Sequence, residues 1–300
     1  MRIRAAARAL AAWTGVGLPG LLMAPIGPDA VASAPVCERP CLEHFVDRYL
    51  DAMIAHDPSK VPFAPEVKFT QNGQRLELGD GLWRSITAKG TYRMFVADVT
   101  SGHVAFLGSI RDADTPAMLA LHLRIRKDQI TAAEMLVQRS AASAQGFEEI
   151  GYTWRDSVAG GSMSREELLK TANTYFSGVQ QNDGKDLYPL DHECNRIENG
   201  TSWGCLEQLR SGALRFVSRI RDRRFVAVDP ERGLVFSYVF FDQMNGPQPP
   251  QTQEVAEAFR IERGRIRQIL ALTEAAPYGM NSGWSSWTEG MSGAARDASR

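Results

Sequence analysis

The sequence contains an internal repeat that limits the folds it can adopt. Four pairs of landmarks recur with an offset of 126 to 136 residues: Tyr49 and Tyr175, Gln71-Asn72-Gly73 and Glu198-Asn199-Gly200, Asp98 and Asp229, and the segments 125–130 and 261–266. A period near 130 residues is too long for one solenoid unit, so it indicates a duplicated domain. A chain of 300 residues also has the length of about two domains.

The segment 219–242 predicts a β-hairpin in the second copy. Residues 225–228 and 234–241 are rich in β-branched and aromatic side chains, and Asp229 to Gly233 supply a turn. Apolar side chains alternate onto both faces of the second strand, which predicts a hairpin buried on both sides. Asp242 and three arginines, Arg219, Arg221 and Arg223, add polar groups at its ends, and the arginines are expected on one face.

Each copy has the order of an α+β domain, with a helix before its long strands. Residues 40–56 have helical periodicity, and Ser164 with Glu167 forms a capping box for a second helix. Strands are expected at residues 92–97, 103–110, 118–125, 130–136, 254–261 and 266–272. We therefore predict modules at 37–140 and 164–284, joined by a linker at 141–163 and packed through their sheets as an intramolecular pseudo-dimer.

Both ends of the chain are expected to lie outside the modules. Residues 1–34 combine early arginines, an apolar stretch and small-residue cleavage sites, which predicts a signal peptide and export to a periplasm or the outside. An uncleaved membrane anchor is the alternative, but the apolar run is short and broken by glycine and proline. Residues 285–300 are small and polar, and we expect a disordered tail.

Export favours disulfides for the four cysteines. Local pairing would give one bridge in each module, Cys37–Cys41 and Cys194–Cys205, although four cysteines allow three pairings. Cys37, Cys41 and His44 have the spacing of a metal cluster, but no fourth ligand lies nearby, so we predict no metal site.

The composition excludes several classes of function. The net charge is −1, which gives no general attraction to nucleic acid. The sequence has no phosphate-binding glycine loop, serine-hydrolase elbow or zinc-protease motif, and we expect no cofactor. Membrane contact is not expected after cleavage of the signal.

The chain resembles a known tandem family. The likeness rests on Cys37-x3-Cys41, on the segments 194–200, 220–224, 229–233, 240–242 and 277–284, and on the helix-then-sheet order. These features resemble the domain-of-unknown-function family 8021 and, in fold, the nuclear transport factor 2-like proteins, which include SnoaL-like polyketide cyclases. The resemblance implies two cone-like modules, each with helices packed on a curved antiparallel sheet. It supplies no catalytic residue that aligns with this sequence.

The second module carries the strongest candidate chemistry. Residues 191–200 gather acids, a histidine and an arginine in one short segment. We predict that Glu198 or His192 moves a proton, as the catalytic group. The substrate-binding residues expected around it hold an anionic oxygen or line the wall: Arg196, Arg219, Arg221, Tyr238, Asp242 and Tyr278. The alternatives are an ion pair between Glu198 and Arg196, and salt bridges from the arginine strand to the first module.

A second, weaker candidate lies in the first module. His122 sits in a predicted strand, where it could line a pocket with Trp83, Tyr92 and Glu134. A histidine in such a place is more often a satisfied core residue.

Two classes of function fit these features. One is a cofactor-independent enzyme that acts on a small organic molecule, with anions among the candidates, by proton transfer, as an isomerase, lyase, dehydratase or cyclase. The other is an exported ligand-binding or interaction module without catalysis.

Overall fold

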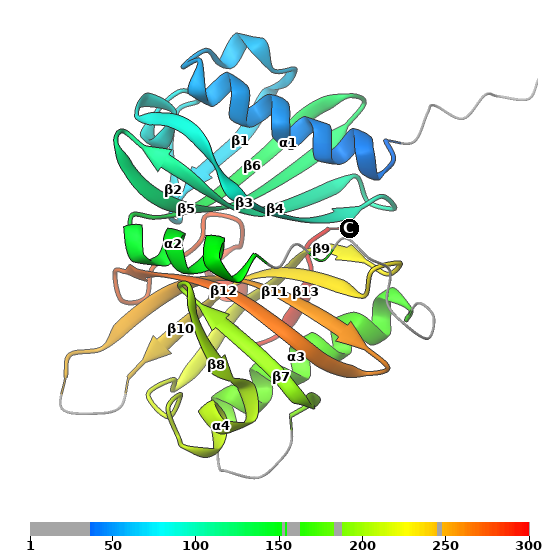
Figure 1. The fold of residues 1–300 in the computed structure, drawn as a ribbon, viewed down its shortest axis with the longest axis vertical. Coiled ribbons are helices and arrows are strands. Elements are labelled where there is room, and N and C mark those ends of the chain that lie inside the picture. The colour runs from blue at the N-terminus through cyan, green and yellow to red at the C-terminus, as the bar shows by residue number, and fades with distance from the viewer. Residues whose placement is uncertain (1–36, 152–153, 155–162, 183–187, 245–247, 300) are drawn as a thin grey trace, which may run out of the picture. The chain divides into compact units, whose positions relative to one another are not determined.

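The computed structural model describes residues 37–151, 154, 163–182, 188–244 and 248–299 (Figure 1). The chain divides into residues 1–35 and the compact unit 36–300, and all that follows concerns the second. The predicted signal peptide lies outside the described residues. Within the described ranges, no helix has the length and apolar character needed to cross a membrane.

The first module is one helix on a six-stranded sheet. The helix α1 (Arg39–Ile54) precedes β1 (Phe63–Gln71), β2 (Gln74–Arg75), β3 (Ile86–Asp98), β4 (His103–Asp112), β5 (Thr115–Arg126) and β6 (Gln129–Gln138). Short 3-10 turns occupy Pro58–Lys60 and Gly81–Arg84. The strand order is β2-β1-β6-β5-β4-β3.

The second module repeats this plan. The helix α3 (Arg165–Gln181) precedes β7 (Leu190–Glu198), β8 (Thr201–Gly204), α4 (Cys205–Arg210), β9 (Arg219–Asp229), β10 (Leu234–Gln243), β11 (Gln251–Glu262) and β12 (Arg265–Ala276). The sheet order is β13-β9-β10-β11-β12-β7-β8, in which β13 is the strand Ala295–Asp297. The expected α+β class with two tandem modules is confirmed, as is the capping box at Ser164.

Three expectations need correction. Each sheet is mixed, because β1 pairs in parallel with β6, and β7 with β12. The expected linker begins with a helix, α2 (Ala141–Ile150). The expected disordered tail contains α5 (Trp287–Gly290) and β13 (Ala295–Asp297). This tail is ordered because β13 pairs with the edge strand β9 and Arg296 binds the buried Asp222.

The sheets divide the interior into three layers of core. One face of each sheet packs beneath its own helix, around Tyr49 and Trp83 in the first module and Tyr175 and Phe176 in the second. The opposite faces share a third core, in which Leu107 and Leu136 join Phe236 and Tyr238. In Figure 1 the two sheets accordingly lie between α1 and α3.

Two reciprocal ion pairs join the modules at matched positions. Arg39, the first residue of α1, binds Asp229 at the end of β9, with Nη2 3.1 Å from Oδ1. Arg165, the first residue of α3, binds Asp98 at the end of β3, with Nη1 2.7 Å from Oδ2. Each module thus gives the other the same contact.

Both predicted disulfides are present. Cys37 is bonded to Cys41, and Cys194 is bonded to Cys205. Each bridge stays within one module.

Candidate functional site

The structure brings Arg196 and Glu198 together on the inner face of the second sheet. Arg196 is only 1% exposed and forms an ion pair with Glu198. Its Nε also donates to Glu257 Oε1 at 3.2 Å. The guanidinium therefore holds two carboxylates, which corresponds to the structural alternative stated above for this pair.

Glu257 on β11 was not predicted to belong to this cluster. Burial raises its pKa to about 7, although Arg196 opposes the shift. A signal was available in the sequence, since Glu257 interrupts the buried apolar positions Val255 and Phe259 of the same strand face. Aromatic rings fill the surrounding interior, with the Tyr175 and Phe259 centroids 5.5 Å apart. The cluster is thus enclosed by packed side chains.

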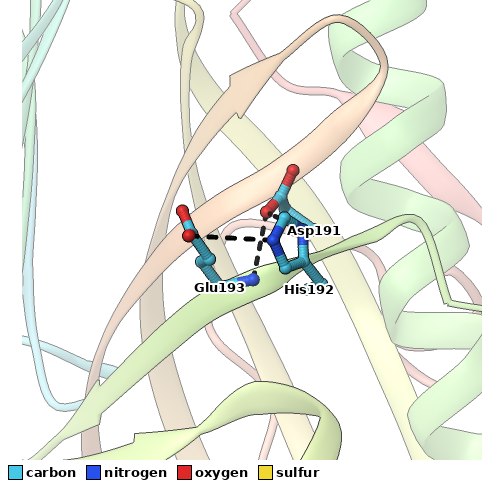
Figure 2. Close-up of side chains that lie close together, drawn as sticks. All are labelled: Asp191, His192 and Glu193. Carbon is cyan, nitrogen blue, oxygen red and sulfur yellow. Dashed lines mark hydrogen bonds and ion pairs between the residues drawn. The ribbon is translucent and has the colours of Figure 1, made fainter.

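His192 lies apart from this cluster, at the surface. Its side chain is 80% exposed and lies between Asp191 and Glu193, as Figure 2 shows. The ligand atoms of these three residues lie within 4.8 Å of one another, a spacing that could hold a metal ion. Arg267 already pairs with both carboxylates, at 2.8 and 3.3 Å. His192 and Glu198 are separated by about 20 Å along an extended strand, too far to share one proton-transfer site.

The arginines at the start of β9 bind protein groups. Arg219 Nε and Arg221 Nε both donate to Asp242 Oδ2 at 2.8 Å, and Thr252 donates to the other carboxylate oxygen. Arg221 Nη1 also donates to the Met280 carbonyl at 2.9 Å. Arg219, Arg221 and Asp242 therefore connect β9 and β10 to the C-terminal segment.

A β-bulge overturns the expected alternation of these arginines. Asp222 has a φ of 50°, and the pairing of β9 with β10 shifts there. Arg223 consequently turns toward α3, where Nη1 lies 3.0 Å from both Asn173 Oδ1 and Ser177 Oγ. Arg224 turns to the first module and binds Glu134. The prediction of three arginines on one face was wrong because a bulge moves each following side chain to the other face.

The two tyrosines that were expected to line the wall of the substrate site lie in different surroundings. Tyr238 is fully buried in the shared core, and its hydroxyl donates to the Glu134 carbonyl at 3.4 Å. Tyr278 is 48% exposed. Neither lies on the inner face that carries Arg196.

A cavity of about 310 Å³ opens between the two sheets. Its lining comes from β4, β5, β6, β9 and the C-terminal segment: His103, His122, Arg124, Ala132, Glu134, Arg224, Val226, Trp284, Arg296, Asp297 and Ala298. Its volume is at the lower end of the range for small-molecule sites. We call it the inter-sheet cavity.

Strand register gathers the titratable groups of this cavity. His122 lies opposite Glu134 on the neighbouring strand, and His103 lies opposite Arg124. The stacked histidine rings bring His103 Nδ1 to 2.9 Å from His122 Nε2. On its other side, His122 Nδ1 is 3.8 Å from Glu134 Oε2.

Burial sets the charge of this histidine pair. It lowers the pKa of His103 to about 2, with repulsion from His122 adding to the effect, and it lowers the pKa of His122. Burial opposes ionisation of Glu134, but Arg224 outweighs it and lowers the pKa of that carboxyl. Arg224 donates two hydrogen bonds to the Glu134 carboxylate, with lengths of 2.6 and 2.8 Å. At neutral pH the site is therefore a neutral imidazole pair beside an ionised carboxylate.

The earlier interpretation of His122 was half right. His122 and Glu134 do meet beside a cavity, but Trp83 lies in the core under α1, and Tyr92 packs against Phe147. His103 and Arg224 were not assigned to this site. The alternation of β4 puts His103 on the outer face, but only knowledge of the sheet packing identifies that face as a cavity wall.

Known structures similar to this chain include enzymes. An LEH-like epoxide hydrolase from M. tuberculosis is 15% identical, with coverage of 36% of this chain and 84% of its own, at a TM-score of 0.30. A pinacolase from Penicillium brevicompactum is 13% identical, with 39% and 90% coverage and a TM-score of 0.32. A SnoaL-like polyketide cyclase from Agrobacterium tumefaciens is 18% identical, with 36% and 91% coverage and a TM-score of 0.26.

Sequence comparison assigns the chain to a protein family. No curated protein matches the chain. The model of a domain of unknown function, DUF8021, matches residues 37–137 and again residues 161–273. These two stretches cover most of the chain and correspond to the two modules. The chain therefore belongs to the DUF8021 family and carries its domain in two tandem parts.

Proposed function

We propose that the chain binds a small organic molecule in the inter-sheet cavity and transfers a proton there without a cofactor. The observation that carries this proposal is the buried His103–His122 pair on the wall of a cavity of ligand size. The groups predicted in the second module are paired with one another, exposed or, for Tyr238, packed in the shared core, so we move the proposed chemistry to this cavity.

The hydrogen bond within the pair leaves two choices for the working atom. Either neutral ring can be the donor between His103 Nδ1 and His122 Nε2, and we take His122 as the donor. Neutral His103 must then accept at Nδ1 from the Nε2–H of His122. This leaves a lone pair on His122 Nδ1, a buried atom with no hydrogen-bond partner among the described residues. His122 Nδ1 is the proposed proton acceptor.

Glu134 gives a charged His122 one counter-charge. When Nδ1 takes a proton from a substrate carbon or hydroxyl, the imidazolium stands beside the Glu134 carboxylate. That charge pair offsets part of the cost of charging the buried ring, whose pKa burial keeps below its ordinary value. His122 can return the proton to another substrate atom, which fits an isomerase, lyase, dehydratase or cyclase. In this scheme His103 is a positioning residue.

A generic proton-abstraction probe tests the proposal. Base removes the C–H proton of nitrobenzisoxazole, the N–O bond breaks, and the product is a coloured cyanophenolate. We expect the wild-type protein to catalyse this reaction and His122→Gln to reduce kcat/KM by about 100-fold. His192→Gln, at an exposed histidine, is the matched control and should retain full activity.

The second candidate function is ligand binding without catalysis. It is favoured by Arg224, which donates a hydrogen bond to each carboxylate oxygen of Glu134. Glu134 is therefore not available as a proton acceptor for a ligand. Equal rates for wild type and His122→Gln on the probe, with folding unchanged by circular dichroism, would reject the enzyme and leave this alternative.

We further infer that the two modules form an intramolecular pseudo-dimer and that the mature chain is exported. The reciprocal pairs Arg39–Asp229 and Arg165–Asp98 support the first inference. The two disulfides support the second, because such bonds persist in oxidising compartments. Mass spectrometry of the mature N-terminus from the native host tests export, and a protein that still carries residues 1–34 would contradict it.

A further inference from the structure

We infer that the ligand of the inter-sheet cavity is a small organic carboxylate, bound through Lys68 and Arg124 at the cavity mouth. This inference deepens the proposed function and rests on it for the identity of the cavity.

Strand register places two cations on one row of the first sheet. Lys68 pairs with Ala132, Ala132 pairs with Arg124, and Arg124 pairs with His103. Residues aligned across neighbouring strands point to the same face, and three of these four line the cavity. The small side chain of Ala132 leaves space between the two long cations.

These two cations have no carboxylate partner among the described residues. Arg124 Nε donates to the Thr131 hydroxyl, and Lys68 donates to the Gly283 carbonyl, but neither forms an ion pair. The other charges of the cavity are matched: Glu134 binds Arg224, Asp297 binds Arg165, and Arg296 binds Asp222. The cavity therefore carries an excess of positive charge.

The pKa of Lys68 reflects the same imbalance. Desolvation lowers it below the ordinary value, and repulsion from Arg224, Arg75 and Arg124 adds to this effect against the attraction of Glu134. An anion at the mouth would relieve that repulsion. The planar fork of Arg124 can bind a carboxylate through two hydrogen bonds.

The C-terminal segment supplies the wall for the carbon body of the ligand. Trp284 lies beneath Lys68, whose Nζ is 4.3 Å from the ring centroid, and its indole donates to Thr70 Oγ1 at 2.8 Å. Val226, Ala298 and Ala132 complete an apolar lining. A carboxylate at Arg124 would leave its carbon atoms within this lining, beside the histidine pair. Trp284 and Ala298 lie outside the stretches that match the family model, so this wall is not part of the matched domain.

Benzoate and its neutral isostere benzamide provide the test. Isothermal titration of the full chain should show saturable binding of benzoate and at least tenfold weaker binding of benzamide. Arg124→Met and Lys68→Met should each weaken benzoate binding by about tenfold, because each removes a charge-assisted hydrogen bond. Lys60→Met, at an exposed lysine of the first module, is the control and should leave affinity unchanged. The benzoate affinity should also fall as salt rises.

Histidine side-chain NMR locates the bound probe. The chain has five histidines, and benzoate should shift the ring signals of His103 and His122 while those of His192 stay fixed. Three results would overturn the inference: no saturable binding of either benzoate or acetate, equal affinity for benzoate and benzamide, or affinities that Arg124→Met leaves intact.

The outcome can be separated from that of the proposed function. His122→Gln should lose nitrobenzisoxazole turnover and still bind benzoate, because His122 is not a carboxylate ligand. Carboxylate binding without any turnover in the wild type would retain this inference and reject proton transfer. Wild-type turnover of nitrobenzisoxazole that benzoate does not inhibit would retain proton transfer and reject carboxylate binding in the cavity.

Discussion

The interiors of the two modules differ at matched positions. Strand register aligns three pairs of inward-facing residues, the first of each pair from the first module: Phe69 and Arg196, Phe106 and Ser237, and Leu121 and Glu257. A fourth pair, Tyr49 and Tyr175, lies on the matched helices α1 and α3. The first interior is apolar, and its tyrosine accepts a hydrogen bond from Trp83 at 3.2 Å. The second interior places an arginine and a glutamate where the first has a phenylalanine and a leucine.

This difference shows that buried polarity alone does not locate a functional site. Arg196 pairs with Glu257 within packed aromatic rings, whereas His103, His122 and Glu134, which line the inter-sheet cavity, lie on the outer face of the apolar module. The more polar of the two interiors is therefore not the one beside this cavity.

Breaking the Arg196–Glu257 pair should have the largest effect. Arg196→Met leaves Glu257 buried without its cation, and we expect the free energy of unfolding to fall by about 3 to 5 kcal/mol. Arg196→Met combined with Glu257→Leu imitates the first module and should recover much of that loss. Urea unfolding followed by circular dichroism measures both. A double variant no more stable than the single one would contradict a closed ion cluster.

Buried acids should make stability fall as pH rises. Glu254 is buried, its carboxylate oxygens have no partner among the described residues, and burial with repulsion from Glu134 raises its pKa to about 8. A folded state that holds the proton more tightly than the unfolded state loses stability between the ordinary pKa and the raised one. We expect Glu254 alone to contribute a loss of about 2 to 3 kcal/mol between about pH 5 and pH 8. The lowered pKa values of His103 and His122 act in the opposite direction up to the ordinary histidine pKa, so the loss is read from the difference between wild type and a Glu254 variant.

Glu254→Gln isolates this effect, because the amide cannot ionise. The variant should be more stable than wild type at pH 8, and its stability should depend less on pH. Glu257 contributes in the same direction up to about pH 7 and remains present in the variant. Equal pH slopes for the two proteins would show that Glu254 does not hold its proton in the folded state.

The reciprocal ion pairs should give smaller and similar effects. Asp98→Asn and Asp229→Asn each weaken one of the two matched contacts with Arg165 and Arg39. We expect each to lower the free energy of unfolding by about 1 to 3 kcal/mol, because both carboxylates are buried. Asp114→Asn, in an exposed turn, is the control. Costs that differ strongly between the two would break the proposed symmetry.

The sequence predicted the tandem fold because its landmarks are local. Asn72-Gly73 and Asn199-Gly200 both form the turn after the first strand of a module, and Asp98 and Asp229 both end strands before turns. Helix periodicity and the capping box at Ser164 are equally local signals. The parallel pairing of β1 with β6 was missed because it joins segments far apart in the chain.

The candidate site was harder to predict because it depends on non-local packing. The bulge at Asp222 reverses which arginines meet the first module, and a positive φ at an aspartate has no clear sequence signal. The cavity draws residues from both modules and from the C-terminal segment, which looked disordered from its composition. The sequence suggested that His122 and Glu134 lie close together. It gave no sign that β9 and the C-terminal segment face them across the cavity.

The ratio of activities between His122→Gln and Glu257→Gln tests the central claim most directly. Both variants change a buried titratable group, one beside the inter-sheet cavity and one inside the second module. With nitrobenzisoxazole as the substrate, we predict that His122→Gln loses about 100-fold in kcat/KM and that Glu257→Gln stays within about threefold of wild type. The reverse order, with Glu257→Gln inactive and His122→Gln active, would place the chemistry in the second interior and contradict the account.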